Sequence, residues 1–179
     1  YEHSDKWKLC LSFIMGNHKL LIVDISNPLL PAKVSSRIIG GDGGTVDRLR
    51  KIAYSSGYVY CCHQSENKLY IVDVSSSANP AVVGSVSISA AAVGAYSVAV
   101  KGNYAYVGCL AIGTFAVVDC TEKTAPVVVK TLVDVDHYDS MCGEIVGNYY
   151  YTANWATNSL VIFDISDPIN TLQAGIITD

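Results

Sequence analysis

Short apolar runs alternate with small polar clusters along the chain, and one arrangement of them returns four times. In each copy an apolar run ends in Asp, a Ser or Thr follows two residues later, and Pro closes the segment. The copies read LLIVDISNP from Leu20, LYIVDVSSSANP from Leu69, FAVVDCTEKTAP from Phe115 and LVIFDISDP from Leu160. The anchor residues are Asp24, Asp73, Asp119 and Asp164, separated by steps of 49, 46 and 45 residues. This nearly constant step predicts four units of one repeat.

A second pattern precedes each anchor. Leu or Tyr stands fifteen and thirteen positions before every Asp, and a spacing of two is typical of one face of a β-strand. The pairs are Leu9 and Leu11, Tyr58 and Tyr60, Tyr104 and Tyr106, and Tyr149 and Tyr151. Ser56-Gly57, Gly102-Asn103 and Gly147-Asn148 come just before the last three pairs. Because Gly and Asn tolerate positive φ, these dipeptides predict tight hairpin turns.

Each unit reads as four short strands. In the third unit the strands are YSVAVKG, YAYVGCL, TFAVVDC and PVVVKTLVD, and no segment has a helical period. Four-stranded units of this length match propeller blades, which run about 40 to 50 residues. We therefore predict an all-β fold, a β-propeller with four readable four-stranded blades, as a closed four-bladed ring or as part of a larger propeller. The expected blades within the single domain 1–179 are approximately 1–39, 48–89, 95–134 and 139–179.

The first unit departs from this pattern. Where an opening strand is expected it holds YEHSDKWK, which is polar and charged. We expect the innermost strand of the first blade to be degenerate, displaced or donated by another segment. The same residues have no basic start followed by an apolar run, so they predict no signal peptide.

The recurring Asp and Pro are interpreted as turn chemistry. Asp and Ser or Thr side chains accept or donate hydrogen bonds where a turn leaves the backbone unpaired, and Pro needs no donor. All five prolines lie in the segment after an anchor: Pro28, Pro31, Pro80, Pro126 and Pro168. Asp24, Asp73, Asp119 and Asp164 are therefore predicted to be structural turn residues rather than an acidic site.

The runs LLIVD, LYIVD, FAVVD and LVIFD, with Gly-Asn-Tyr turns upstream and Pro loops downstream, resemble the LVIVD repeat of bacterial and archaeal surface proteins. The resemblance covers about Leu9 to Asp179. It implies a β-propeller, an extracellular or surface-attached location, no general catalytic activity and no shared catalytic residues. A virion or an intracellular assembly is the alternative location.

Composition narrows the function classes. Half of the 179 residues are apolar, 16% are charged and the net charge is −4. The chain has no Lys/Arg cluster, so a nucleic-acid partner is not expected. Residues 86–100 form the longest weakly polar stretch, too short for the roughly 20 residues of a membrane span. The six cysteines stand at unlike positions and are expected to be reduced and mostly buried: Cys10, Cys61, Cys62, Cys109, Cys120 and Cys142.

The predicted links between blades carry the candidate chemistry. The link DVDHYDSM places Asp134, Asp136, His137 and Asp139 within six residues. Carboxylates beside an imidazole suit a hard cation such as calcium, or acid and base roles. The segment lacks the central Gly and terminal Glu of a calcium loop, so a solvated loop is the favoured interpretation. The link GGDGG, residues 40–44, has no P-loop context and is interpreted as a flexible linker rather than an anion cradle.

Histidines and tyrosines receive structural interpretations. His63 and Cys109 both stand ten residues before an anchor, and His63 is expected to be a buried or rim histidine. His3 and His18 have no partner that the sequence indicates. The repeated tyrosine pairs are expected to fill the interfaces between blades rather than form a sugar-binding platform.

These observations favour a non-catalytic scaffold for protein or glycan binding, or a structural component of a surface layer or particle. The expected partners are a protein or a glycan, with self-assembly or completion of the ring by another segment. No cofactor is expected apart from a bound cation. The alternative is an enzyme of hydrolase or lyase type with a cation-assisted site on the inter-blade loop face.

Overall fold

The computed structural model describes residues 9–14, 18–41, 48–88, 94–110, 113–133 and 140–179. In these residues the chain forms fifteen β-strands and no helix. The strands make three four-stranded sheets and one three-stranded sheet, and every pairing within them is antiparallel. The predicted all-β architecture is therefore confirmed.

Each sheet is one repeat unit, with its strands in chain order. The first sheet is β1 (Leu9–Ile14), β2 (Lys19–Asp24) and β3 (Ala32–Ile38). The second is β4 (Leu49–Ser55), β5 (Tyr58–His63), β6 (Lys68–Asp73) and β7 (Ala81–Ser87). The third is β8 (Ala95–Lys101), β9 (Tyr104–Cys109), β10 (Thr114–Asp119) and β11 (Val127–Val133). The fourth is β12 (Ser140–Val146), β13 (Tyr149–Asn154), β14 (Ser159–Asp164) and β15 (Leu172–Thr178). Residues 1–8, where the degenerate strand of the first unit was expected, lie outside the described residues.

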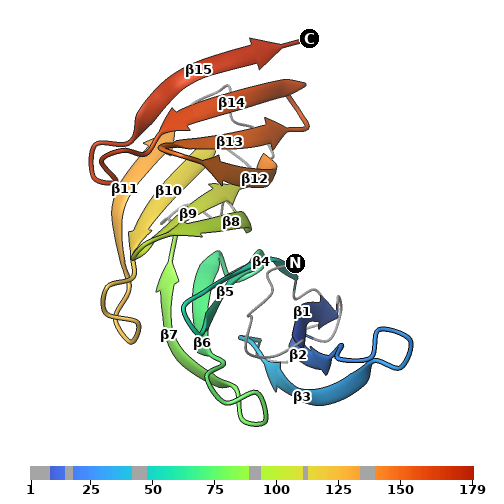
Figure 1. The fold of residues 1–179 in the computed structure, drawn as a ribbon. Helices are drawn as coiled ribbons and strands as arrows, with labels where there is room; N and C mark the ends of the chain where they lie inside the picture. The colour runs from blue at the N-terminus through green and yellow to red at the C-terminus, as the bar shows by residue number, and fades with distance from the viewer. Residues whose placement is uncertain (1–8, 15–17, 42–47, 89–93, 111–112, 134–139) are drawn as a thin grey trace.

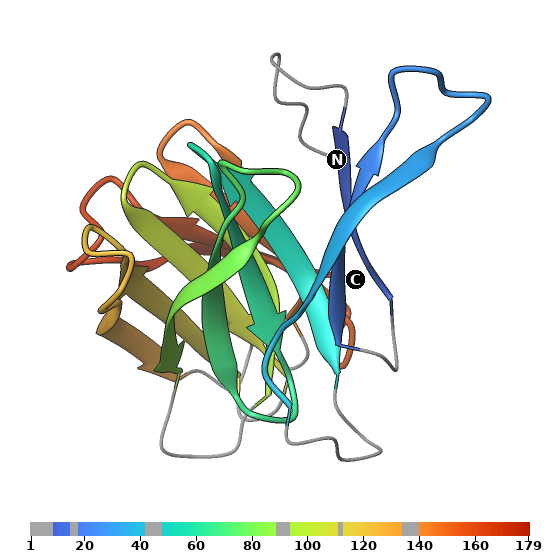
Figure 2. The same ribbon diagram turned by 90° about the horizontal axis from the view of Figure 1, so that it is seen from below.

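The four sheets follow one another in a curved row, with the first and fourth at its two ends (Figure 1). Strand β8 contacts both β4 and β12, so the opening strands of the second, third and fourth sheets meet on the concave side. In the view from below, the first sheet stands beside the second (Figure 2). This is the arrangement of propeller blades, in which each sheet covers a face of its neighbour.

Successive sheets are joined by apolar layers. Alternate residues of a strand point to opposite faces, so each middle sheet packs on both neighbours. The layer between the first and second sheets contains Leu20, Ile39, Leu49, Val59, Cys61, Tyr70 and Val72. The layer between the second and third contains Tyr60, Leu69 and Ile71 against Ala105, Val107, Ala116 and Val118. The layer between the third and fourth contains Tyr106, Phe115 and Val117 against Tyr150, Val161, Phe163 and Ile165.

The tyrosine pairs divide according to their place in the row of sheets. Tyr60 and Tyr106 are fully buried between sheets, as predicted. Tyr58, Tyr104 and Tyr151 are half-buried, whereas Tyr149 in the fourth sheet is exposed. The prediction that these tyrosines fill blade interfaces therefore holds for the second and third sheets and not for Tyr149 and Tyr151 of the fourth sheet.

A β-bulge recurs at one position of every sheet. The pairing of the third repeat strand with the outermost strand changes register two residues before the anchor Asp. The shifts lie at Ile22/Val23, Ile71/Val72, Val117/Val118 and Ile162/Phe163. The four units thus share a backbone irregularity as well as a sequence motif.

Five cysteines whose side chains the structure describes are free thiols: Cys61, Cys62, Cys109, Cys120 and Cys142. Cys61, Cys62, Cys109 and Cys120 are buried, as expected, but Cys142 is exposed. Burial raises the pKa of Cys109 to about 12 and is the main reason that the pKa of Cys120 rises to about 11. The buried thiols are consequently protonated and unreactive at neutral pH, because the thiolate is the reactive form.

Candidate functional site

The four anchor carboxylates lie at the start of the turns between the third and fourth repeat strands. In each turn one carboxylate oxygen accepts a hydrogen bond from the backbone N–H two residues later. The N···O distances are 2.8 Å at Asp24, Asp73 and Asp119 and 2.9 Å at Asp164. Backbone and side-chain hydrogen bonds from Ser26 hold the pKa of Asp24 below its ordinary value, and Ser166 acts in the same way on Asp164. These carboxylates are engaged in local backbone geometry, and the register places one in each sheet.

The structure does not describe the acidic link that holds the candidate cation or catalytic residues and that was interpreted as a solvated loop. Asp134, Asp136, His137 and Asp139 all fall within residues 134–139, which lie outside the described residues. Within the part of the chain that is described, no three His, Cys, Asp or Glu side chains gather in a way that would hold a metal ion.

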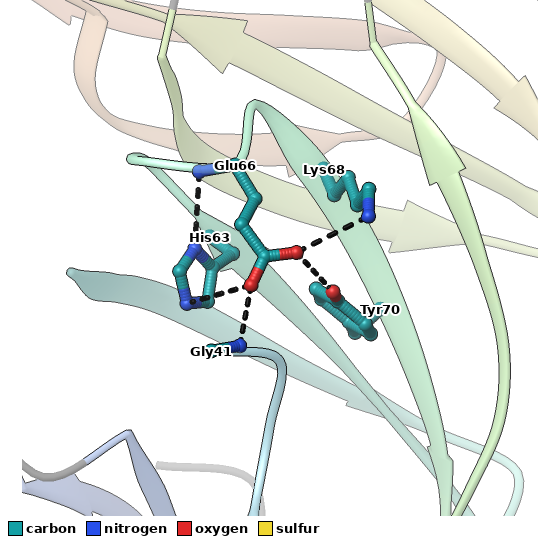
Figure 3. Close-up of polar contacts among 5 residues, drawn as sticks. All are labelled: Gly41, His63, Glu66, Lys68 and Tyr70. Atoms are coloured by element: carbon teal, nitrogen blue, oxygen red, sulfur yellow. Dashed lines mark hydrogen bonds and ion pairs between the residues drawn. The ribbon is translucent and has the colours of Figure 1, made fainter. Parts of the chain in front are cut away.

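The most connected ionisable cluster is centred on Glu66, in the turn between β5 and β6 (Figure 3). Its Oε1 accepts a hydrogen bond from the Gly41 N–H at 2.5 Å and faces His63 Nε2 at 3.7 Å. Its Oε2 accepts a hydrogen bond from the Tyr70 hydroxyl and pairs with Lys68 Nζ at 3.2 Å. A carboxylate offers about four acceptor positions, and the Gly41 N–H, the Tyr70 hydroxyl and Lys68 Nζ occupy three of those of Glu66.

His63 is held in one tautomer by the same turn. The Glu66 backbone N–H donates to His63 Nδ1 at 3.3 Å, so the ring proton lies on Nε2 and points toward the carboxylate. The His63 ring is fully buried, stacks on His18 at 6.0 Å between centroids and meets the edge of Tyr70 at 5.9 Å. The interpretation of His63 as a buried histidine agrees with this geometry. Its partner His18 comes from the turn between β1 and β2, so the cluster joins two sheets.

Gly40 and Gly41, in the link between the first and second sheets, pack closely against this cluster. A Cβ on Gly40 would lie 2.6 Å from Glu66 Oε1 and 2.9 Å from the Tyr70 hydroxyl. Gly40 also has a positive φ of 65°, which L side chains rarely adopt. Residues 40 and 41 therefore belong to an anchored segment, whereas the sequence predicted a flexible linker over residues 40–44. Residues 42–44 are outside the described residues.

Opposing effects set the charge of Glu66. Burial pushes its pKa upward, but hydrogen bonds from Tyr70, the Gly41 N–H and Lys68, together with His63, outweigh burial. The pKa of Glu66 consequently lies below its ordinary value of 4.5. The carboxylate is ionised at neutral pH and accepts a hydrogen bond from the Gly41 N–H, so it acts as an anchor for the link.

We expect Glu66→Gln to lower the free energy of unfolding by about 1–2 kcal/mol at pH 7, because charged acceptors of several hydrogen bonds are lost. A depressed folded pKa stabilises above the unfolded value of 4.5, and this contribution disappears as pH falls through the folded pKa. The difference between wild type and Glu66→Gln should therefore shrink on acidification below 4.5. Urea unfolding from pH 7 to pH 3 measures it. The exposed Glu144 provides the control, and an equal effect of Glu144→Gln would contradict the anchor role.

The sequence did not indicate this cluster, although one signal was present. Counting back from each anchor, the positions of Glu66, Lys68 and Tyr70 are filled in the third unit by Ile112, Thr114 and Ala116. Only the second unit places a carboxylate, an ammonium and a phenol there. A carboxylate at a repeat position that holds Asn17, Ile112 and Thr157 in the other units is the feature that marks the site.

A second polar group contains hydroxyls only. Ser140 Oγ lies 3.0 Å from Ser97 Oγ and 2.6 Å from Thr152 Oγ1, and Ser97 Oγ lies 3.4 Å from the Tyr150 hydroxyl. All four residues are buried between the third and fourth sheets. The hydrogen bonds between them satisfy buried hydroxyls and fix how the two sheets meet.

A groove of about 470 Å³ opens on the concave side. It is lined by β4, β8 and β12, through residues 51–54, 98–101, 143–145 and 147. Lys101 Nζ crosses between sheets and donates to the Gly147 carbonyl and to Asn148 Oδ1, both at 2.7 Å. The groove is the position of a propeller's central channel, and Lys51, Lys101 and Glu144 are its charged lining residues.

Radially packed four-stranded sheets with a central groove define the class of β-propeller proteins. The model of the LVIVD repeat matches residues 13–36, 48–88, 94–134 and 144–178, which is most of the chain. The chain therefore belongs to the LVIVD-repeat family, as the sequence motifs predicted. None of the described residues forms a helix that is long and apolar enough to span a membrane.

Solved structures share the fold at low sequence identity. A protein from Lactobacillus plantarum aligns with a TM-score of 0.79 at 14% identity, over 96% of this chain and 54% of its own. A "putative 6-phosphogluconolactonase" from Bacteroides uniformis aligns with a TM-score of 0.80 at 13% identity, over 95% of this chain and 51% of its own. A protein of the same description from Bacteroides fragilis gives 0.72 at 13% identity, over 95% and 55%. The chain thus spans about half the length of these structures. No curated protein sequence matches it.

Proposed function

We propose that the chain is a non-catalytic propeller scaffold that holds a macromolecular partner and serves as a structural building block. The supporting observation is a row of large apolar side chains exposed on one face of the fourth sheet: Val146, Tyr149, Leu160, Leu172 and Ile177. Water contact with so much apolar surface is unfavourable, so such a face is typical of an interaction site. Four of the five side chains are aliphatic, which favours a protein over a glycan, because sugars stack on aromatic rings.

The ionisable groups support the same proposal. The anchor carboxylates accept backbone hydrogen bonds, and the Glu66 carboxylate contacts four polar groups of its own chain. A general base must reach the proton that it abstracts, whereas Glu66 is already engaged by the Gly41 N–H, the Tyr70 hydroxyl and Lys68. His63, its neighbour, is fully buried.

Hydrolysis is the second candidate function, and the two structural neighbours described as putative 6-phosphogluconolactonases suggest its substrate. Their identity of 13% supports a common fold alone. We expect that adding the 179-residue chain does not raise the rate of 6-phosphogluconolactone hydrolysis above the rate in buffer alone. The acid released is measured by pH-stat titration. Turnover above that rate would overturn the scaffold, and its loss in Glu66→Gln would place the chemistry at the Glu66 cluster.

A further inference from the structure

The turn between β2 and β3 carries two adjacent, largely exposed leucines. Leu29 is 88% exposed and Leu30 is 75% exposed, the highest values of any large apolar side chain in the described residues. The turn projects beyond the sheets, as the blue loop that joins β2 to β3 (Figure 2). Adjacent exposed leucines at a protruding tip are typical of an interaction site.

The exposure belongs to the turn position and does not depend on what precedes the first sheet. Ile169 holds the position of Leu29 in the fourth unit and is 56% exposed, although the fourth sheet packs on the third. In the second and third units the residues at the two leucine positions are exposed as well: Ala78, Asn79, Thr124 and Ala125. The preceding sheet is contacted two residues after the tip, where a Cβ on Gly84 would lie 3.2 Å from Pro126 Cδ. A side chain at the tip therefore stays exposed when another sheet precedes it.

The backbone N–H groups of the tip are already hydrogen-bonded. Asn27 Oδ1 accepts a hydrogen bond from the Leu29 N–H at 3.1 Å, and the Asn27 carbonyl accepts one from the Leu30 N–H at 3.0 Å. Pro28 and Pro31, on either side of the leucines, have no N–H. An unpaired backbone donor is costly in an apolar medium, and residues 28–31 present none. The tip can therefore leave water without losing donor hydrogen bonds.

The tip is also uncharged. No charged residue lies between Asp24 and Lys33, whose charges are opposite. The fourth unit has the same backbone geometry, because Asp167 Oδ1 accepts from the Ile169 N–H at 3.1 Å. There, a hydrogen bond from the Asn170 side chain holds the pKa of Asp167 below its ordinary value, so that turn carries a negative charge at neutral pH. A charge resists transfer out of water, so the first turn can enter an apolar medium more easily than the fourth.

These properties fit a bilayer without net charge. Anionic lipids and nucleic acids attract clusters of Lys and Arg, and only Lys33 follows the tip closely. A protein partner would need a recess shaped for two protruding leucines, whereas the boundary of headgroups and acyl chains accepts apolar side chains without a preformed shape. Apolar side chains, paired N–H groups and zero net charge together favour lipid over protein.

We propose that the tip formed by Leu29 and Leu30 inserts into the interface of a lipid bilayer without net charge and tethers the propeller to it reversibly. A single myristoyl chain binds membranes with an association constant of about 10⁴ M⁻¹, and two leucines bury less apolar surface, so about 10³ M⁻¹ is expected for one tip. The contact goes beyond the scaffold function and uses a surface other than the exposed face of the fourth sheet.

Flotation of the 179-residue chain with vesicles of pure phosphatidylcholine tests the proposal. At about 1 mM accessible lipid, about half of the chain should float with the vesicles. The double variant Leu29→Ser/Leu30→Ser should bind at least tenfold more weakly, because burial of one leucine strengthens binding about tenfold or more. Adding anionic phosphatidylglycerol should not strengthen binding, since the charges of Asp24 and Lys33 cancel.

Ile169→Ser is the matched control, because it removes an exposed apolar side chain from the same position of the charged fourth turn. This variant should bind vesicles as wild type does. Both variants should keep the unfolding temperature of wild type, since the altered side chains are exposed. An equal loss of binding in Ile169→Ser and in the double variant would contradict insertion of the first tip.

Two further results would overturn the proposal. Binding only to vesicles that contain phosphatidylglycerol would show an electrostatic contact. No flotation with phosphatidylcholine at about 10 mM lipid, tenfold above the expected midpoint, would exclude the lipid contact and leave a protein recess as the partner of the tip. The scaffold function is tested separately by lactone turnover without lipid, so the two failures are distinguishable.

Discussion

Phe163→Ala is expected to lower the free energy of unfolding by about 3–5 kcal/mol, the cost of truncating a buried aromatic residue. Phe163 is 0% exposed and stacks on Phe115 of the third sheet, with ring centroids 4.0 Å apart and planes at 5°. Its ring also contacts Tyr150, at 6.3 Å between centroids. Because Phe163 joins two sheets, its loss creates a cavity in the layer between them. Urea denaturation followed by circular dichroism measures the change.

The matched control lies three residues earlier on the same strand. Leu160 is on the opposite face of β14, and Leu160→Ala should cost less than about 1 kcal/mol, because surface substitutions have small effects. Equal losses for the two variants would mean that the face of the fourth sheet that carries Leu160 is packed. That result would contradict the open face on which the proposed function depends.

Gly84→Ala is expected to destabilise the chain by about 3 kcal/mol or more. Its Cβ would meet backbone, the Lys123 carbonyl oxygen at 2.1 Å, together with Pro126 Cδ at 3.2 Å. A backbone obstacle cannot rotate away, so the second and third sheets must separate, and overpacking of this kind is costly. Thermal unfolding by calorimetry gives the size of the loss.

Gly175→Ala is the counterpart in the fourth sheet. The two glycines hold one repeat position, but a Cβ on Gly175 would meet only the Ile162 side chain at 3.8 Å, so alanine should be neutral or slightly stabilising. A large loss at Gly175 would show that the strand itself rejects a side chain at this position. Comparing the two variants thus distinguishes a stability loss caused by the strand itself from one caused by contact with the neighbouring sheet.

The architecture could be predicted from the sequence because the same strand and turn residues recur in four units. The spacing of Tyr104 and Tyr106 identifies a strand, and the Asp119 turn identifies where the next strand pair is connected. Four copies in phase then exclude accidental matches. The strands of the third unit follow the predicted segments closely, with β8 to β11 at Ala95–Lys101, Tyr104–Cys109, Thr114–Asp119 and Val127–Val133.

The Glu66 cluster was not predictable in the same way. Its members come from two sheets, and His18 and His63 are 45 residues apart in the sequence. Their contact depends on how one sheet leans on the next, which side-chain periodicity does not encode. Gly40 illustrates the difficulty, since a glycine-rich segment suggests freedom, whereas here the absent Cβ allows close packing.

The bulge shared by all four sheets has a consequence for solubility. Each outermost strand, from β3 to β15, leaves a row of backbone donors and acceptors at the rim of the molecule. A regular strand there would template pairing with another chain, as in amyloid, but a bulge twists the strand and interrupts the ladder. The bulge at Ile162/Phe163 and its three equivalents therefore disfavour strand pairing between molecules at the outermost strands, and with it fibril growth.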